Sequence, residues 1–124
     1  MAMKMIDRQA GDVTVVGLNG RLVLGDETAL FRNTVRDLIS RGQKNLLLNL
    51  ADVPFIDSSG IGELVSAFLA ARREGGNVKL LNLTRRVHDV LQIVKLMTVF
   101  EVFDNETVAL ESFKRQGQQT ARAS

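Results

Sequence analysis

Apolar side chains recur along this chain with two different periods, and the period at each point predicts the local structure. Short runs that are apolar throughout, or that alternate with polar positions, are typical of β-strands. The first two runs flank a Gly-Asp turn and predict a hairpin with Val13 and Val15 facing inward. The strands expected on this basis are residues 3–9, 13–18, 21–24, 45–50, 78–83 and 99–103.

Between the strands, apolar residues recur every three or four positions, as they do on the buried face of an α-helix. Two of these stretches are followed by glycine, after Arg41 and after Glu74, as the C-termini of helices prefer. Four helices are therefore expected, each beginning at a residue that can cap it. The expected caps are Asp26, Asp57 or Ser58, Thr84 and Asp104.

The alternation of strands and helices after the hairpin predicts an α/β fold. We expect a mixed β-sheet with an N-terminal hairpin and parallel strands in its centre, flanked by about four helices. A chain of 124 residues is long enough for one domain and too short for two ordinary ones. We place the domain at residues 1–115 and expect the polar residues 116–124 to be a disordered tail.

The composition narrows the possible functions. A net charge of +2 and the absence of Trp and Tyr give little support to a nucleic-acid partner. No apolar run reaches the roughly 18 residues of a membrane span. With a single His and no Cys, neither a metal nor another cofactor is predicted. These properties predict a cytoplasmic domain, and the lack of disulfides agrees with that expectation.

The most informative stretch is residues 55–62, Phe-Ile-Asp-Ser-Ser-Gly-Ile-Gly, which joins a predicted strand to a predicted helix. Gly60 and Gly62 resemble the opening of a dinucleotide-binding fingerprint, but Val65 stands where the third glycine or an alanine belongs. Position 80 is Leu rather than the acid that would bind a ribose, and no Gly-Lys-Ser/Thr loop is present. A nucleotide site is therefore not expected.

The same stretch does not predict a serine hydrolase. Ser58 or Ser59 could be combined with His88 and an Asp on paper, but neither serine lies in a Gly-x-Ser-x-Gly elbow. His88 lies between charged neighbours on a predicted helix, a position more typical of a surface residue. We therefore expect no enzymatic activity.

A serine at an exposed helix start is a suitable substrate for a kinase. A phosphate there would add about −1.5 to −2 charges, and the helix N-terminus would tolerate the anion. The fold should then persist, while a partner docked beside Asp57 would meet new negative charge. The simpler alternative is that Ser58 or Asp57 only caps the helix.

Residues 55–62 resemble the signature of the STAS-domain anti-sigma factor antagonists. The resemblance extends over roughly residues 13–113 and includes the Gly20-Arg21-Leu22 turn, the glycine pair at 75–76 and the strand with Leu80, Leu81 and Asn82. It implies a STAS-like mixed sheet and a binding protein without catalysis. The Asp-Ser-Ser-Gly core is specific for the superfamily and less so for the role of one member.

The resemblance also implies a partner-switching mechanism. The unphosphorylated antagonist would bind an anti-sigma factor, which is also a histidine-kinase-like ATPase and serine kinase, and release a sigma factor. The kinase would phosphorylate Ser58, and a serine phosphatase would reverse this. The residues implied to line the docking surface are Asp57, Ser59, Gly60, Ile61, Gly62 and Asp26. We expect a monomer or weak dimer.

One position departs from the family pattern. Many members have an Asp after the Gly-x-Leu of the early turn, where this chain has Val23. Either Asp26 takes over that role or the partner differs. The alternative hypothesis is a STAS scaffold, or a cytoplasmic subunit of a larger signalling or lipid-transport assembly, that phosphorylation does not switch.

Overall fold

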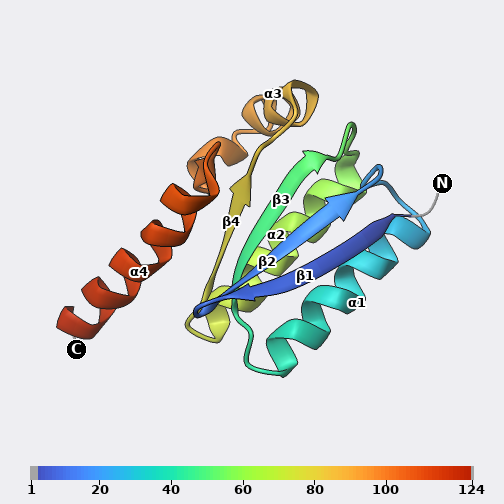
Figure 1. Cartoon of the computed structure of the whole chain (residues 1–124). Coiled ribbons are helices and arrows are strands. Elements are labelled where there is room, and N and C mark those ends of the chain that lie inside the picture. Colours follow the sequence, from blue (N-terminus) through green and yellow to red (C-terminus); the bar gives the residue numbers. More distant parts are fainter. Residues whose placement is uncertain (1–2, 124) are drawn as a thin grey trace.

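A computed structural model gives the structure of residues 3–123, with side chains described up to residue 115 (Figure 1). Five strands form one sheet in the order β1-β2-β3-β4-β5. The strands are β1 (Lys4–Ala10), β2 (Val13–Asn19), β3 (Asn45–Asp52), β4 (Asn77–Leu81) and β5 (Val102–Phe103). The helices are α1 (Asp26–Ser40), α2 (Ser58–Arg73), α3 (Arg85–Ile93) and α4 (Glu106–Ala123), with a 3₁₀ turn η1 (Leu96–Thr98).

The sheet is mixed, as predicted. β1 and β2 form an antiparallel hairpin, and β2, β3, β4 and β5 pair in parallel. Helical crossovers connect the parallel pairs, which is why the sequence alternates between the two apolar periods. β1 is an outer strand, and its Ile6 is 75% exposed.

Different helices pack on the two faces of the sheet. Side chains of α1, α2 and α3 pack with one set of alternating strand positions, which includes Leu46, Leu48 and Leu80. On the other face, Leu47 and Leu81 pack with α4. The larger core therefore lies on the side of α1 and α2, as the positions of these helices behind the sheet in Figure 1 indicate.

A lysine is buried where α4 meets the sheet. Lys79, in the middle of β4, is 1% exposed. Its Nζ lies 2.8 Å from Ser112 Oγ, 2.8 Å from Glu101 Oε2 and 4.6 Å from the ring centroid of Phe113. These contacts neutralise the cation and attach α4 and the segment before β5 to β4.

Two predicted helix caps are wrong. Gly25, not Asp26, is the N-cap of α1, and Asp26 is its first helical residue. Gly25 has φ 132°, which few other residues adopt, and its N–H donates to Thr28 Oγ1. At α4, Asn105 replaces Asp104 as the cap, because its side chain accepts the Val108 N–H at 3.0 Å. Thr84 caps α3 as predicted.

Two predicted strands are shorter than expected. Residues 21–24 contribute a single bridge, Leu22 with Ile56. Only Val102 and Phe103 of residues 99–103 join the sheet, because the N–H groups of Val99 and Phe100 are bonded to Leu96 O of η1. Of the expected disordered tail at residues 116–124, residues 116–123 belong to the last part of α4, where the structure describes no side chains, and residue 124 lies outside the described residues. The domain boundary at residue 115 stays a prediction.

Candidate functional site

The start of α2 is held by Asp57. Its Oδ1 accepts the Gly60 N–H at 2.9 Å, which satisfies a backbone group left unpaired at the helix N-terminus. Its Oδ2 accepts the Leu24 N–H at 3.0 Å, from the loop between β2 and α1. One carboxylate therefore caps α2 and ties the neighbouring loop to it.

Backbone contacts reinforce this connection. The Leu22 N–H donates to Phe55 O at 3.0 Å, and the Asp57 N–H donates back to Leu22 O at 3.3 Å. Leu22 and Ile56 are both buried, so the contact between the loop and the segment before α2 lies in the core. The sequence predicts sheet-like structure here, and the structure shows a single bridge that positions the site.

The Leu24 N–H is also the main electrostatic influence on Asp57. It lowers the pKa of the Asp57 carboxyl below its ordinary value, and the N–H groups of Gly60 and Ser59 act in the same direction. Partial desolvation opposes them. The carboxylate is therefore charged at neutral pH and contributes a fixed negative charge beside Ser58.

Ser58 is the first residue of α2 and is exposed. Among the described residues, no hydrogen bond involves its hydroxyl. Of the two caps that the sequence leaves open, the structure selects Asp57. Ser58 Oγ is thus free of a structural task and open to an incoming group, at a helix end that favours anions.

The two glycines of the signature have different surroundings. Gly60 is buried, and a Cβ there would lie 2.2 Å from Leu22 O and 2.8 Å from Ile56 Cγ1. At Gly62, which is exposed, a Cβ would meet nothing within 4 Å. Gly60 is therefore needed for the close approach of the loop, whereas Gly62 leaves open space on the outer face of α2.

Comparison with known protein families identifies the family of this chain. The model of the STAS domain family matches residues 4–109. The chain belongs to the STAS domain family.

Several relatives of this STAS domain have assigned roles. It is 28% identical over 99 residues to the anti-sigma F factor antagonist of Paenibacillus polymyxa, covering 79% of this chain and 84% of that protein. A crystal structure from Thermotoga maritima, named a "putative anti-sigma factor antagonist", matches with a TM-score of 0.83 and 25% identity over 89% of this chain and 94% of the other.

The fold is also that of the antagonist SpoIIAA. Its unphosphorylated form matches with a TM-score of 0.70 and 20% identity, covering 90% of this chain and 98% of SpoIIAA. The phosphorylated form from Bacillus matches with a TM-score of 0.69 and 21% identity, covering 88% and 98%. The fold is therefore shared with both states of that protein.

The remaining predicted site residues lie around the same end of the STAS domain. Ser59 and Ile61 are half-buried in the first turn of α2. Asp26 is exposed at the start of α1, two residues after the loop residue that binds Asp57. Val23, which stands where the resemblance leads us to expect an acid, is half-buried and carries no charge.

Leu24 also lies at this end of the domain, although its sequence pattern does not predict an exposed position. Its side chain is 75% exposed, although its backbone N–H is bound to Asp57. The bond from the Leu24 N–H to Asp57 places this exposed residue at the same end of the domain as Ser58. The apolar run Leu22-Val23-Leu24 predicts a strand, and the exposure of its last residue becomes visible only because that strand is a single bridge.

Other candidate sites find no support in the described part of the chain. His88 is close to Asp89 of its own helix, with Nδ1 3.4 Å from Oδ1, and makes no contact with either serine. The side chains that the structure describes include no group of acidic, His or Cys residues that could hold a metal ion. None of the described helices is long and apolar enough to span a bilayer.

Proposed function

We propose that this STAS domain is an anti-sigma factor antagonist that phosphorylation of Ser58 switches off. In its unphosphorylated form it binds an anti-sigma factor and thereby releases a sigma factor. The observation that supports this most directly is the division of roles at the start of α2, where Asp57 caps the helix and Ser58 Oγ is exposed and unbonded. The relatives named as anti-sigma factor antagonists support the same function.

The partner is proposed to be both anti-sigma factor and serine kinase, with a histidine-kinase-like ATPase fold. Ser58 Oγ forms a bond to the γ-phosphorus of ATP as the bond to ADP breaks, and the hydroxyl proton is released. A serine phosphatase hydrolyses the ester and returns the free serine and inorganic phosphate. This domain contributes the substrate hydroxyl and the surface that presents it, not the catalytic groups.

The phosphate acts on the interface rather than on the fold. It adds about −1.5 to −2 charges at a helix N-terminus, which stabilises an anion. Asp57 already places one negative charge beside it. A partner surface that accommodates Ser58 and Asp57 would meet two adjacent anions, and a carboxylate or apolar group opposite them would be repelled.

The proposed docking surface combines the exposed residues around Ser58. Gly62 supplies open space, Leu24 an apolar contact and Asp26 a second acid. Gly60 is buried and contributes by letting the loop approach α2. Asp57, Ser59 and Ile61 complete the surface at the first turn. The chain is proposed to act as a monomer or weak dimer in the cytoplasm.

The test is a pull-down from native lysate with wild-type, Ser58→Asp and Thr107→Asp baits. Thr107 is also exposed in the first turn of a helix, so Thr107→Asp controls for a new acid at a helix start. We expect a histidine-kinase-like ATPase on the wild-type and Thr107→Asp baits only, and ATP-dependent phosphorylation that Ser58→Ala abolishes.

Two results would contradict the switch. If all three baits retain the same partners, Ser58 does not control binding, and the scaffold alternative motivated by Val23 gains support. If the Ser58→Ala protein incorporates as much phosphate as wild type, the acceptor is another residue.

A further inference from the structure

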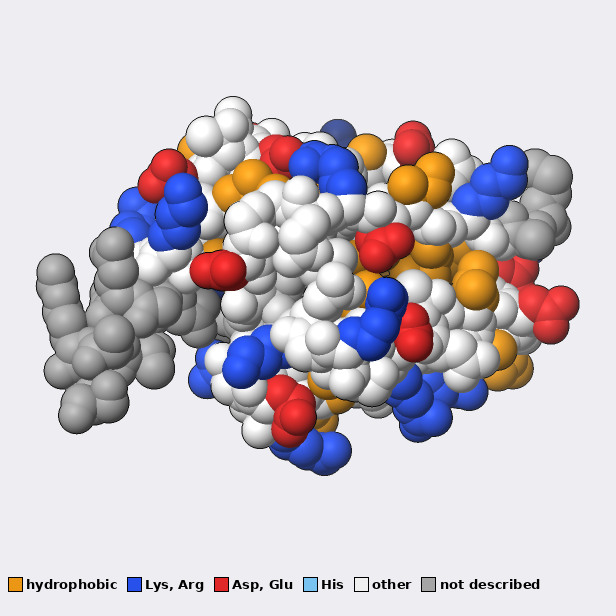
Figure 2. All heavy atoms as spheres, turned by 60° about the horizontal axis from the view of Figure 1, so that its bottom comes forward, with side chains coloured by type: hydrophobic (Ala, Val, Ile, Leu, Met, Phe, Trp, Pro, Cys, Tyr) orange, Lys and Arg blue, Asp and Glu red, His pale blue; other side chains and the backbone are white. Residues whose placement is uncertain are grey.

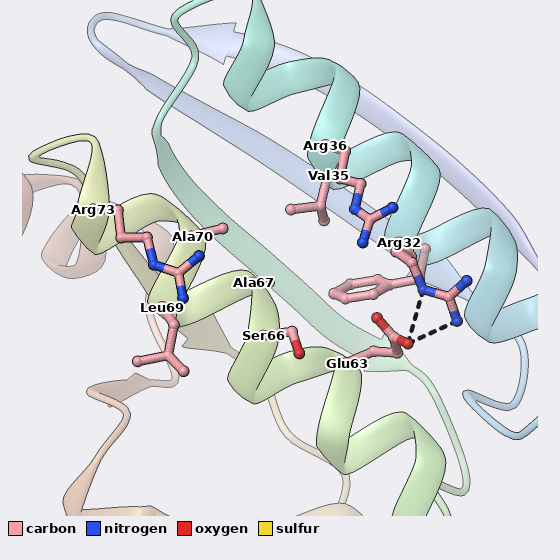
Figure 3. Close-up of a pocket in the computed structure, with 10 residues that line it drawn as sticks. Arg32, Val35, Arg36, Glu63, Ser66, Ala67, Leu69, Ala70 and Arg73 are labelled. Carbon is pink, nitrogen blue, oxygen red and sulfur yellow. Dashed lines mark hydrogen bonds and ion pairs between the residues drawn. The ribbon is translucent and has the colours of Figure 1, made fainter.

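A groove runs between α1 and α2, away from the start of α2 (Figure 3). Its volume is about 370 Å³, and its floor includes the buried side chains of Phe31, Val35 and Ala67. Arg36 of α1 and Arg73 of α2 also line it. In Figure 3, the Arg36 side chain extends from α1 and the Arg73 side chain from α2, on opposite sides of the space between the two helices.

These two arginines have no anionic partner among the described residues. The third arginine of the groove, Arg32, is already neutralised, since its Nε and Nη2 lie 3.0 and 2.8 Å from Glu63 Oε2. The helix dipole accounts for a cation at the C-terminal end of α2, but not for Arg36 in the middle of α1. The groove therefore presents two uncompensated cations over an apolar floor.

One exposed face of α2 leads from Ser58 to the residues that line the groove. Ser58, Gly62 and Ser66 are spaced by four residues on α2, and all three are exposed. Leu69, which is 48% exposed, and Arg73 continue the same face. The 16 residues from Ser58 to Arg73 are separated by 15 helical steps, which extend over roughly 22 Å at 1.5 Å per residue. A partner segment that begins at Ser58 can therefore follow α2 into the groove.

The two arginines do not belong to a strongly basic molecule. On the face shown in Figure 2, basic and acidic side chains are interspersed with apolar ones. A net charge of +2 for the whole chain agrees with this mixture. Two uncompensated arginines in one groove are therefore a local feature, complementary to local negative charge.

We propose that the partner of this domain places an acidic segment lengthwise along the α1–α2 groove, with carboxylates on Arg36 and Arg73. This inference rests on the proposed function, because it extends the Ser58 surface to a second contact with the same partner. Apolar side chains of the segment would lie on Val35 and Ala67. Carboxylates fit because guanidinium groups bind them in a planar, bidentate geometry.

Photo-crosslinking in native lysate tests whether a protein that binds this domain places an acidic segment in the groove. The probe is p-benzoylphenylalanine in place of Leu69, with the same replacement of Val108 on α4 as control, because both side chains are 48% exposed. We expect a crosslink at position 69 to a segment rich in Asp and Glu, and none to that protein at position 108. Adding Arg36→Glu and Arg73→Glu should reduce the crosslink at least about tenfold.

A charge-matched variant separates the groove from net charge. Arg85 and Arg115 are exposed and unpaired among the described residues, so Arg85→Glu with Arg115→Glu should leave the crosslink within about twofold of wild type. The proposal is overturned if position 69 gives no crosslink, if the captured segment is not acidic, or if the Arg36 and Arg73 changes have no effect.

The same crosslink distinguishes this proposal from the proposed function. Combining the Leu69 probe with Ser58→Asp should abolish the crosslink if Ser58 controls the complex. If the crosslink to an acidic segment survives Ser58→Asp but is lost with Arg36→Glu and Arg73→Glu, the groove contact is supported and the Ser58 switch is contradicted.

Discussion

At the scale of single residues, the contacts that hold the start of α2 are made by other residues than Ser58, the proposed phosphorylation site. Asp57 provides the cap and the bond to the Leu24 N–H, and Gly60 provides the close approach of the Leu22 loop. Ser58, between them in sequence, carries out neither task. A hydroxyl can therefore be modified here without removing a contact that the fold depends on.

The cap should be visible in the pH dependence of stability. Asp57→Ala should lower the free energy of unfolding by about 1 kcal/mol at pH 7, because the helix loses its cap. The folded-state pKa of Asp57 is lowered, so its contribution is complete above the ordinary value of 3.8 and is lost as the pH falls through the lowered pKa. The difference between wild type and Asp57→Ala in urea unfolding should therefore shrink below about pH 4.

Asp57→Asn is the control, since Asn also caps helices but carries no charge. It should be close to wild type below that pH and less stable above it. A stability difference between wild type and Asp57→Asn that does not change with pH would contradict the assignment of the lowered pKa to this cap.

The two glycines make an internal comparison. A Cβ at position 60 meets backbone at 2.2 Å, so Gly60→Ala should lower the free energy of unfolding by about 2–3 kcal/mol. At position 62 the space is open, and Gly62→Ala should raise it by about 0.5–1 kcal/mol, because alanine favours the helix. Urea unfolding measures the free energy of unfolding of both variants. Equal effects of the two substitutions would contradict the difference in packing around the two glycines.

Residue chemistry explains which caps the sequence can predict. Thr84 is predictable because the residues around it offer no stronger candidate. The predictions of Asp26 and Asp104 are wrong because each has a competitor next to it in the sequence, and the competitor that wins depends on backbone angles. The cap of α1 has a positive φ, which Gly25 adopts easily and an aspartate would not. At α4, Asn105 is one residue closer to the helix than Asp104.

At the scale of elements, α4 and β4 are joined through Lys79. Its ammonium is buried between Ser112 and Glu101, and Glu101 itself is largely exposed. A buried cation with a solvated partner contributes little net stability, but removing only the partner leaves the charge with too few acceptors. The two ends of this ion pair should therefore respond differently to substitution.

Lys79→Met should change the free energy of unfolding by less than about 1 kcal/mol, since it replaces a buried charge by an apolar chain of similar length. Glu101→Ala should lower it by about 1–2 kcal/mol, because the Lys79 ammonium stays buried. Thermal unfolding followed by circular dichroism compares the two variants. A larger loss for Lys79→Met than for Glu101→Ala would contradict this account.

The sequence indicates most elements because their apolar periods are local properties. The central strand, expected at residues 45–50, is observed as β3 (Asn45–Asp52) with Leu46, Leu47 and Leu48 fully buried. The environment of Lys79 could not be predicted, because Glu101 and Ser112 reach it from more than twenty residues away. Nor could the α1–α2 groove, which depends on how two helices pack.

At the scale of the whole molecule, the proposed phosphorylation site is independent of the core. Ser58 is exposed, whereas the residues that form both hydrophobic clusters are buried. Matches to both the unphosphorylated and phosphorylated forms of SpoIIAA show that one fold is compatible with both states in that protein. The proposed switch is accordingly a change of surface charge on a constant fold.

Ser58→Asp should leave the free energy of unfolding within about 0.5 kcal/mol of wild type, with a small gain from an acid at the helix N-terminus. Amide chemical shifts should change only near the start of α2 and the Leu24 loop. The measurements are urea unfolding and a two-dimensional NMR spectrum. Shift changes that extend to α4 would show that the switch acts through the fold.

The order of the strands has a consequence for how the protein is made. Because β1 to β5 follow one another across the sheet in the order of the chain, each strand emerging from the ribosome meets the free edge left by the previous one. No strand has to be inserted between two others already in place. The hairpin can form first, the sheet can lengthen in one direction during synthesis, and α4 covers the second face last.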